Sequence, residues 1–540
     1  MTDEETPDLP STPLITLADL IKPHEVDGED DRETRVRRSL RARLSYYSPL
    51  RIFMAIVILA GIGYFGTKQV QNVIASSVKV KSEFFAPYVD TTLTPTYQFQ
   101  DANQNVAKQT ILGFITAPPS GTCTPSWGGY YSIASAESQI NLTRRLVEYQ
   151  NLGGTAIISF GGQRGRHLST VCTSPSALAS VYSQVISTYH TPAIDLDTEG
   201  SALNDFAAMN RRAQALRLLE SQYPKLQVWL TLPVATNGLQ ENALGVVRTM
   251  LTHRVRLAGI NVMTMDYGVP TSNMAATIES YLKETELQLA NEFTHHGLHL
   301  TAKQIFNRMG ATVEIGQNSD YGEIFTTSDA RSLAAFVLRN SLRRLSMWSL
   351  NRDAPCPTAF GNQEIYSNTC SGTQQSSLQF SNIFNHALTG SITNRHQVIL
   401  APNDISTNPA NAPYPIWQPN FPYPEHYKVV WNGYVYQAKY YNQGTQPTQT
   451  YQYSFQTPWL LIGPVLKTDH APSIPKLPPG TYPAWNAKQA YSTGANVEIG
   501  GEGYQAKYYN QGDNPTAALV NPSTSPWKPL FTLPGEPALN

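Results

Sequence analysis

Charge is scarce in this chain of 540 residues. Asp, Glu, Lys and Arg make up 15% of it, and the two signs nearly cancel to a formal net charge of -1. An average soluble protein has roughly 25% charged residues. The balance of signs excludes the strongly basic surface of a nucleic-acid-binding protein, so we expect no nucleic acid partner. No glycine-rich phosphate-binding motif follows the first predicted strand, so we expect no nucleotide partner either.

Cysteine is scarce as well, and its four positions all lie in the part of the chain after residue 120: Cys123, Cys172, Cys356 and Cys370. None has CxxC spacing, so neither a metal site nor a cofactor is expected. Cys356 and Cys370 are close enough in sequence to close one loop, which leaves Cys123 with Cys172. Two such disulfides require an exported chain. Four free, buried thiols are the alternative.

Tyrosine and proline are abundant, with 29 and 38 residues, and 41% of the chain is hydrophobic. This composition supplies a large core and excludes a chain that is disordered throughout. At roughly 150 residues per domain, the length allows three or four domains.

The N-terminal region has the pattern of a membrane anchor. Seven arginines between residues 32 and 51 precede an uncharged apolar run at 52–66. Basic residues before the apolar run predict a cytoplasmic N-terminus. The run would form about 22 Å of helix, short of the roughly 30 Å hydrocarbon core unless its neighbours join it.

We therefore predict a disordered, basic cytoplasmic tail at 1–50, a transmembrane signal-anchor at 51–74 and exported domains after it. The predicted location is the cell surface, with the membrane as a partner. Cleavage of a signal peptide, which would give a secreted protein, and a buried helix of the globular domain are the alternatives.

Residues 83–392 alternate between short β-branched or aromatic runs and amphipathic helical stretches. The strand candidates are 84–90, 111–117, 155–162, 193–200, 228–235, 260–268, 310–316 and 345–353. The helix candidates are 139–152, 176–189, 203–223, 241–254, 274–293 and 329–344. Eight such strands predict an α/β fold of the (β/α)₈ or TIM barrel type rather than an open sheet.

A different composition follows, rich in Pro, Asn, Gln, Tyr and Trp, and it repeats itself with an offset of 68 residues. The sequence Gln437 to Gly444 recurs as Gln505 to Gly512, and Trp459 corresponds to Trp527. A constant offset indicates two copies of one small all-β module. We place them at 413–464 and 481–531, joined by extended Pro-rich linkers.

Each module is too small to bury all its aromatic rings, so some must be exposed, and exposed rings stack well on the apolar face of a sugar. The candidates for binding are Trp417, Tyr440, Tyr441, Trp485, Tyr508 and Tyr509. We expect one ring of each Tyr pair to point outward, because consecutive strand residues face opposite ways. A purely structural role in a small core is the alternative. The repeated segment resembles the carbohydrate-binding modules of families 5 and 12, which bind chitin and usually have Trp at the Tyr pairs.

Three acids alternate along the fourth predicted strand: Asp195, Asp197 and Glu199. A period of two places them on one face, which in a barrel is the interior. Inward acids at the carboxyl end of a barrel strand are typical of acid–base chemistry. Burial and neighbouring carboxylates raise a pKa, so we expect Glu199, the outermost, to stay protonated near neutral pH and act as a general acid.

These acids occur together with three further motifs in barrel order: Ser159-Phe160-Gly161-Gly162, Met263-Thr264-Met265-Asp266-Tyr267 and Met347-Trp348-Ser349-Leu350. This set resembles the family 18 glycoside hydrolases, the chitinases, over about 300 residues. The resemblance implies retention of configuration by substrate assistance, in which the N-acetyl carbonyl of the substrate attacks the anomeric carbon. Glu199 would protonate the leaving oxygen, Asp197 would orient the acetamide, Asp195 would hold Asp197, and Asp266 would lie beside the acetamide.

The resemblance also implies roles for neighbouring residues. Trp348 would form the apolar floor beneath the distorted sugar, and Ser159 would donate a hydrogen bond beneath the acids. Met265 replaces a Tyr that in many relatives hydrogen-bonds the acetamide oxygen, and a thioether cannot donate. Tyr267, two residues on, is the expected substitute.

The whole pattern predicts an exported endo-chitinase with chitin or another N-acetylglucosamine polymer as its partner. The short interval between the seventh and eighth strands leaves no room for a cleft-walling insertion, which favours an open groove and internal cleavage. A catalytically silent chitin-binding lectin and an endo-β-N-acetylglucosaminidase that acts on other glycans are the alternatives.

Overall fold

A computed structural model describes residues 83–271, 273–320, 322–360, 362–392, 409–451, 456–520, 522–533 and 535–536. The predicted cytoplasmic tail at 1–50 and signal-anchor at 51–74 lie outside the described residues. Within the described ranges, no helix combines the length and the apolar character needed to cross a membrane.

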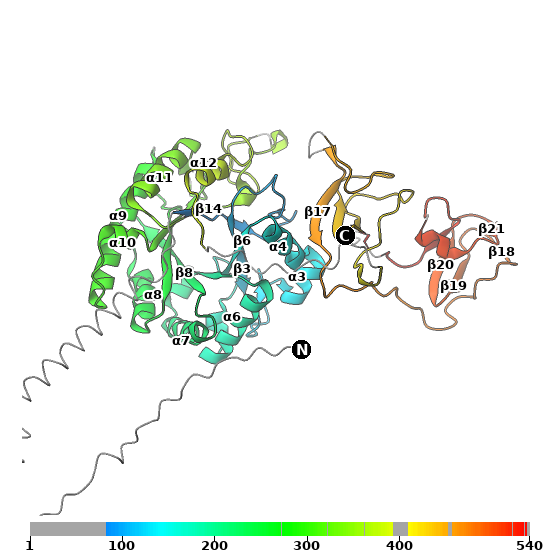
Figure 1. Ribbon diagram of the computed structural model, residues 1–540, viewed down its shortest axis with the longest axis horizontal. Helices are drawn as coiled ribbons and strands as arrows, with labels where there is room; N and C mark the ends of the chain where they lie inside the picture. The colour runs from blue at the N-terminus through cyan, green and yellow to red at the C-terminus, as the bar shows by residue number, and fades with distance from the viewer. Residues whose placement is uncertain are drawn as a thin grey trace, which may run out of the picture. The chain divides into compact units, whose positions relative to one another are not determined.

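Parallel strands close into the predicted barrel (Figure 1). Its first strand has two pieces. The piece β1 (Phe84–Phe85) pairs with the last barrel strand, and the piece β2 (Tyr88–Asp90) pairs with the second barrel strand. The others are β3 (Gln109–Thr116), β6 (Thr155–Gly161), β7 (Ala193–Asp197), β8 (Gln227–Ala235), β10 (Leu257–Met263), β11 (Met309–Glu314) and β14 (Arg344–Trp348). The short strands β4 (Ser126–Trp127), β5 (Tyr131–Ser132) and β9 (Gly238–Leu239) extend the loops at their ends.

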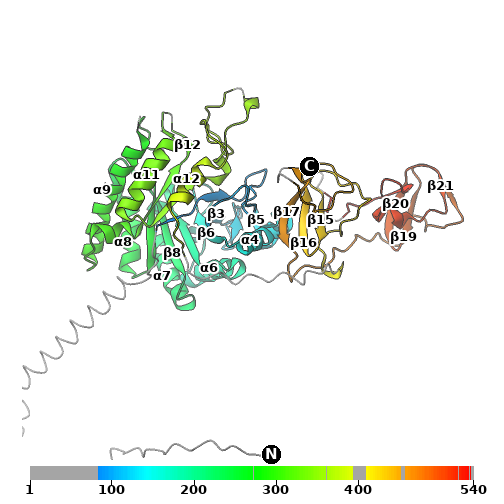
Figure 2. The same ribbon diagram turned by 45° about the horizontal axis from the view of Figure 1, so that its top comes forward.

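Helices cover the outside of the strands, as Figures 1 and 2 show. The structure contains the six predicted helices as α4 (Leu142–Asn151), α6 (Pro175–Tyr189), α7 (Phe206–Gln222), α8 (Glu241–Thr252), α9 (Met274–His295) and α11 (Thr327–Asn340). It adds α3 (Ile133–Ile140), α5 (Leu168–Val171), α10 (Ala302–Phe306) and α12 (Gln379–Ala387). The predicted helix start at residue 139 was wrong, because Asn141 adopts a left-handed conformation with φ 51° that ends α3 before α4 begins.

Local sequence signals fix the helix starts. Ser174 accepts a hydrogen bond from the Ala177 N–H at the start of α6, and Pro175 occupies the first turn, where its missing N–H is no loss. Thr326 and Asp329 form a reciprocal capping box on α11, which satisfies two backbone N–H groups. These helices bury their apolar faces in one large cluster against the outer face of the strands. A separate small cluster, which includes Tyr88 and Trp229, lies among inward residues.

The C-terminal region contains two antiparallel three-stranded sheets. The first consists of β15 (Lys428–Trp431), β16 (Tyr434–Ala438) and β17 (Trp459–Pro464), and the second of β19 (Asn496–Ile499), β20 (Glu502–Ala506) and β22 (Trp527–Pro529). The second copy also pairs β18 (Ala490–Tyr491) with β21 (Asn510–Gln511).

The 68-residue offset extends to the tertiary contacts. The indole Nε1 of Trp459 donates to the Thr445 carbonyl oxygen (2.8 Å), and that of Trp527 donates to the Asp513 carbonyl oxygen (2.9 Å). Two copies of one β module are therefore present.

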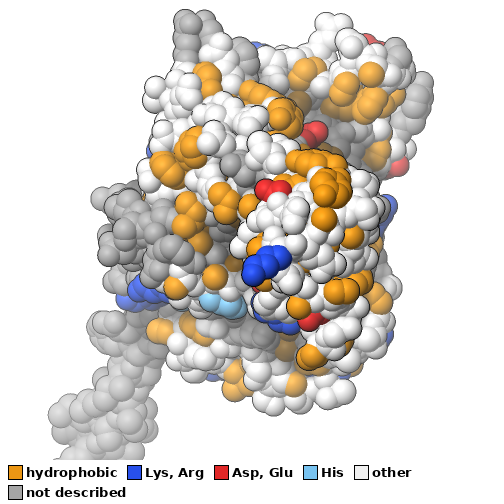
Figure 3. Space-filling view, turned by 90° about the vertical axis from the view of Figure 1, so that its right-hand side faces the viewer, with side chains coloured by type: hydrophobic (Ala, Val, Ile, Leu, Met, Phe, Trp, Pro, Cys, Tyr) orange, Lys and Arg blue, Asp and Glu red, His pale blue; other side chains and the backbone are white. Residues whose placement is uncertain are grey.

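In the space-filling view, hydrophobic side chains lie in patches among largely uncharged surface (Figure 3).

The first module contacts the barrel through α4. Arg144 is 2% exposed, and its guanidinium donates to both carboxylate oxygens of Asp469 (2.7 and 3.0 Å) and to the Pro464 carbonyl oxygen (2.7 Å). A bidentate pair of this kind fixes orientation as well as distance. Pro464 ends β17, so the guanidinium joins the module sheet directly to the barrel.

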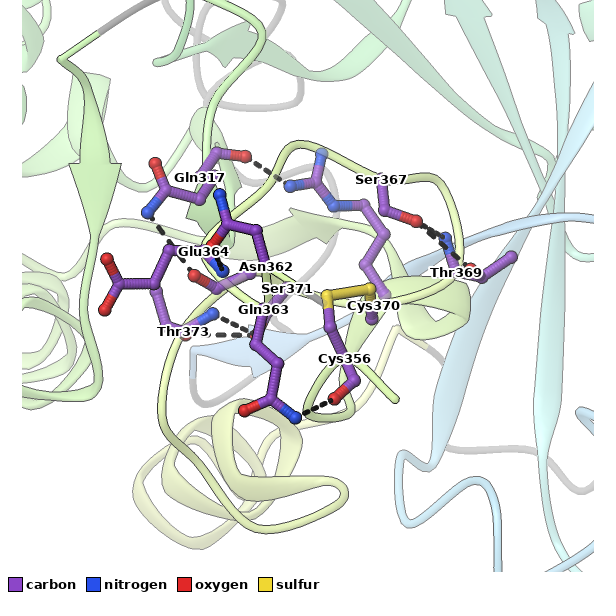
Figure 4. Close-up of a disulfide and its surroundings, with 12 residues drawn as sticks. Gln317, Cys356, Asn362, Gln363, Glu364, Ser367, Thr369, Cys370, Ser371 and Thr373 are labelled. Carbon is purple, nitrogen blue, oxygen red and sulfur yellow. Dashed lines mark hydrogen bonds between the residues drawn. A yellow bond between two sulfur atoms is a disulfide. The ribbon is translucent and has the colours of Figure 1, made fainter. Parts of the chain in front are cut away.

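Both expected disulfides are present. Cys123 is bonded to Cys172, and Cys356 is bonded to Cys370. The second disulfide closes the loop after β14, where the Gln317 N–H donates to the Ser371 carbonyl oxygen (2.7 Å) (Figure 4).

Candidate active site

Strand β7 carries the acids into the barrel. Asp195 and Asp197 are buried, with exposed fractions of 0% and 3%, and Glu199 follows in extended conformation, half-buried, at φ -136°. The end of the preceding strand β6 lies very close to β7 at this point. Only glycine fits there, because Gly161 has φ +105° and a Cβ would lie 2.0 Å from the Asp197 carbonyl oxygen. The structure thus brings the three predicted acids to the carboxyl end of one strand.

Asp195 lies at the centre of a saturated hydrogen-bond network. Its carboxylate accepts from Ser159 Oγ (2.7 Å), Thr231 Oγ1 (2.7 Å), Tyr88 OH (2.9 Å) and Arg344 Nη1 (2.8 Å). Four donors from four different strands hold this carboxylate rigidly. It is therefore placed to support the acids above it rather than to move.

The buried cation of this network, Arg344, was missed at the sequence level, although the pattern contains it. Alternation along β14 places Arg344, Ser346 and Trp348 on one face. Arg344 is fully buried, forms an ion pair with Asp195 and donates to Tyr88 OH (2.7 Å). Its guanidinium also lies over the Trp229 ring, 5.3 Å from the centroid. A buried carboxylate requires such a partner, and this requirement was the available signal.

Asp197 and Glu199 form a hydrogen-bonded carboxyl pair. Burial raises the pKa of Asp197 well above its usual range, and the Glu199 and Asp195 carboxylates raise it further. Burial also raises the pKa of Glu199, which the hydrogen bond from Asp197 partly offsets and the charge of Asp266 increases. Both shifts favour a protonated form, and a hydrogen bond between two carboxyl groups needs a proton, so the pair favours holding one between its members. That proton can lie on either member.

Asp266 follows β10 at the same end of the barrel and contacts a residue that the sequence did not suggest. Its Oδ1 accepts from the Ser319 N–H (3.0 Å). The same N–H donates to Oε2 of Glu314 (3.1 Å), the last residue of β11. Glu314 also accepts from the buried Arg352. Burial, opposed by Arg352 and helped by Asp266, raises the pKa of Glu314 to about 8.

The structure places Tyr267 away from the position predicted for it. The ring packs edge-to-face on Tyr281 of α9, with centroids 4.7 Å apart, and adjoins the cluster between barrel and helices. The prediction assumed that strand alternation continues from Met265, but β10 ends at Met263 and Asp266 has φ 53°. The left-handed residue breaks the alternation. Met265 itself is half-buried.

Trp348 ends β14, in register with Glu314 of β11. Its ring is half-buried, adjoins the cluster of inward residues and stacks on Phe114, with centroids 5.8 Å apart and planes inclined by 21°. Together the two rings form an apolar surface at the end of the barrel where the acids lie.

In the modules, both rings of each tyrosine pair are exposed, by 46% and 63% for Tyr440 and Tyr441 and by 49% and 67% for Tyr508 and Tyr509. The expectation that only one ring of each pair points outward was wrong. The strands end at Ala438 and Ala506, before the pairs begin.

The four tryptophans related by the 68-residue offset behave differently from the tyrosine pairs. Trp417 and Trp485 are half-buried, whereas Trp459 and Trp527 are buried in the two module cores.

Comparisons with known proteins place this geometry in context. No protein-family profile matches the chain. The chain is 31% identical over 282 residues to a probable bifunctional chitinase/lysozyme of Escherichia coli (strain K12), a match that covers 50% of this chain and 31% of that protein. It is 29% identical over 282 residues to Endochitinase 11 of Metarhizium anisopliae, of which the match covers 52%. The chain thus spans at most about half the length of the curated relatives it matches.

Among solved structures, the chain is similar to active domain 2 of a thermostable chitinase from Pyrococcus furiosus, determined in complex with chito-oligosaccharides. The two share 28% identity and a TM-score of 0.50, over 57% of this chain and 95% of that one. The similarity therefore covers nearly the whole of that domain.

Proposed function

We propose that this chain is an endo-acting chitinase, which hydrolyses β-1,4 linkages between N-acetylglucosamine units with retention of configuration. The barrel is a glycoside hydrolase domain, as the similar chitinases indicate. The observation that carries the proposal is the hydrogen-bonded pair of Asp197 and Glu199, which lies directly beyond the buried ion pair of Asp195 and Arg344. That arrangement keeps a transferable proton at the mouth of the barrel.

In the proposed mechanism, Glu199 donates the proton of the carboxyl pair to the leaving glycosidic oxygen. The acetamide oxygen of the substrate attacks the anomeric carbon, so no protein nucleophile is needed. Asp197 then orients the acetamide N–H and stabilises the cationic intermediate with its carboxylate. The deprotonated Glu199 next removes a proton from water, which opens the intermediate and restores the acid.

The surroundings support these roles. Asp195 cannot move, because four donors hold it, and its fixed charge limits where the Asp197 carboxyl can lie. Trp348 and Phe114 offer an apolar face to the distorted sugar, as exposed aromatic rings do at sugar sites. Asp266 contributes negative charge near Glu199.

Internal cleavage and polymer binding belong to the same proposal. Between β11 and β14, residues 315–343 contain only two short strands, β12 (Gly316–Gln317) and β13 (Ile324–Phe325), together with α11. No separate subdomain stands there among the described residues, which favours an open groove. The exposed rings of Tyr440, Tyr441, Tyr508 and Tyr509 suit stacking on chitin. An uncleaved membrane anchor at 51–74 would hold these domains at the cell surface.

Digestion of chitin and of soluble chito-oligosaccharides by wild type and by Glu199→Gln tests the proposal. Loss of a general acid costs roughly 10²- to 10⁴-fold in turnover. Glu241→Gln is the matched control, since the Glu241 side chain is 79% exposed on α8, and it should retain wild-type turnover. Binding without release of oligomers by wild type would indicate a lectin. Cleavage of glycoprotein glycans but not chitin would indicate an endo-β-N-acetylglucosaminidase.

A further inference from the structure

A second pair of carboxyl groups lies at the same end of the barrel as Asp197 and Glu199. It consists of Asp266, which follows β10, and Glu314, which ends the neighbouring strand β11. One backbone N–H, that of Ser319, donates to both of them, at 3.0 Å to Asp266 Oδ1 and 3.1 Å to Glu314 Oε2. Two oxygens that accept from one N–H lie close together. The carboxyl groups of Asp266 and Glu314 are therefore neighbours around the Ser319 N–H.

The charges around the pair do not balance if both acids are ionised. Arg352, fully buried, donates to Oε1 of Glu314 and also to the carbonyl oxygens of Ile315 (3.0 Å) and Gln317. This single cation faces Glu314, which is only 2% exposed. Asp266 is exposed, so burial disfavours the charged form of Glu314 in particular, and a proton on Glu314 removes its repulsion with the adjacent Asp266 carboxylate.

We propose that Asp266 and Glu314 hold one proton between them, and that Glu314 is a positioning residue that fixes Asp266 beside Glu199. The catalytic part of this inference rests on the proposed function. The shared proton ties Asp266 to β11 and keeps the combined charge of the two acids at -1. Glu314 itself acts through Asp266 and does not need to touch the substrate.

Other titratable groups surround this pair, and they set the pH at which it loses its proton. Tyr366, on the loop closed by the Cys356–Cys370 disulfide, hydrogen-bonds Glu314, and Arg352 opposes protonation. Beyond Asp266 lie Glu199, Glu323, Asp320 and Tyr267. With the pKa of Glu314 raised to about 8 by burial and by Asp266, Glu314 keeps its proton below that pH and loses it above.

Infrared difference spectroscopy of the full chain as pH rises through this range tests the shared proton without any substrate. Wild type should lose a protonated-carboxyl band near pH 8, and Glu314→Gln should lack that step, because an amide can donate to Asp266 but does not titrate. Glu323→Gln, which removes a neighbouring acid bonded to the Val269 N–H (3.2 Å), should keep the step. Absence of the step in wild type, or its survival in Glu314→Gln, would overturn the proposal.

The pH profile of kcat/KM on a soluble chito-oligosaccharide tests the positioning role. Wild type should show an additional loss of activity above about pH 8, because two carboxylates then repel and Asp266 leaves its place. Glu314→Gln should lack this additional loss, whereas a merely structural residue would lower activity equally at all pH values. Superimposable profiles would contradict the role. An infrared step in a wild type that cleaves no chito-oligosaccharide would overturn the proposed function and leave the shared proton intact.

Discussion

Replacement of Arg344 by Met should destabilise the barrel strongly. Arg344 and Asp195 both have fully buried side chains, and the guanidinium is the only cation among the four donors to that carboxylate. Removal of one partner of a buried ion pair costs about 3–5 kcal/mol, because the other charge stays buried without compensation. With a urea dependence of about 3 kcal/mol per M for a domain of this size, the barrel transition should move by about 1–2 M.

Urea denaturation of the full chain, followed by intrinsic tryptophan fluorescence, measures this shift. Arg343→Met is the matched control, since that neighbouring guanidinium lies over the Phe84 ring, 5.1 Å from its centroid. That contact is worth about 0.5–2 kcal/mol, and the guanidinium also donates to the Ser391 carbonyl oxygen (3.2 Å); because this acceptor is neutral, its loss strands no buried charge and should cost less than the loss of Arg344. Adding Asp195→Asn to Arg344→Met should recover part of the lost stability, because the unpaired charge disappears while Tyr88 keeps an acceptor. An Arg344→Met variant as stable as Arg343→Met would refute the reasoning.

Further changes separate the roles of individual side chains. Tyr267→Phe should keep kcat on chito-oligosaccharides within about twofold of wild type, since its ring packs on Tyr281 rather than in the barrel; a large drop in steady-state kinetics would restore the substitute role. Tyr441→Ala and Tyr509→Ala should each weaken binding to insoluble chitin about two- to tenfold without changing turnover of soluble oligomers, and unaltered pull-down on chitin would contradict binding by these rings. Arg144→Ala and Asp469→Ala should show a coupling of about 0.5–3 kcal/mol in a double-mutant cycle of unfolding; strictly additive effects would mean that their ion pair does not join module and barrel.

The course of the chain through the barrel was predictable because parallel strands buried on both faces read as short apolar runs between amphipathic helices. The predicted strand bounds were wrong where a residue such as proline changes the hydrogen bonding of the backbone. The first strand was predicted as one run from residue 84 to 90, but it divides around Pro87, which has no N–H to give to a neighbour. Its carbonyl oxygen still accepts from the Ile111 N–H (2.8 Å), so the barrel closes in spite of the break.

The inward acids were predictable only as far as the strand stays regular. Asp195 and Asp197 lie within β7 and are buried as alternation requires. The same rule failed for Tyr267 and for the module tyrosines, because each of them follows the end of a strand. Alternation along the sequence carries information about side-chain direction only while the backbone remains extended.

The residues that complete the site could not be paired from sequence, because their partners are far away along the chain. Arg344 is separated from Asp195 by 149 positions, and Arg352 reaches Glu314 from a loop beyond the next strand. A sequence shows that a buried acid needs a cation, but it does not show which of 39 lysines and arginines supplies it.

The two carboxyl pairs differ in how the nearest arginine contacts them, and this difference favours different roles for them. Behind Asp197 and Glu199 stands an ion pair, Asp195 with Arg344, whose charges cancel. The proton of that pair is therefore held mainly by burial and by repulsion among neighbouring carboxylates, and it can pass to the substrate. Glu314 instead contacts its cation, Arg352, directly, and the proton that we propose for it serves to bind Asp266. In this proposal Glu314 acts through Asp266 and not on the substrate, so its proton has no leaving oxygen to protonate. Glu199 is thus the acid that the barrel leaves free to react.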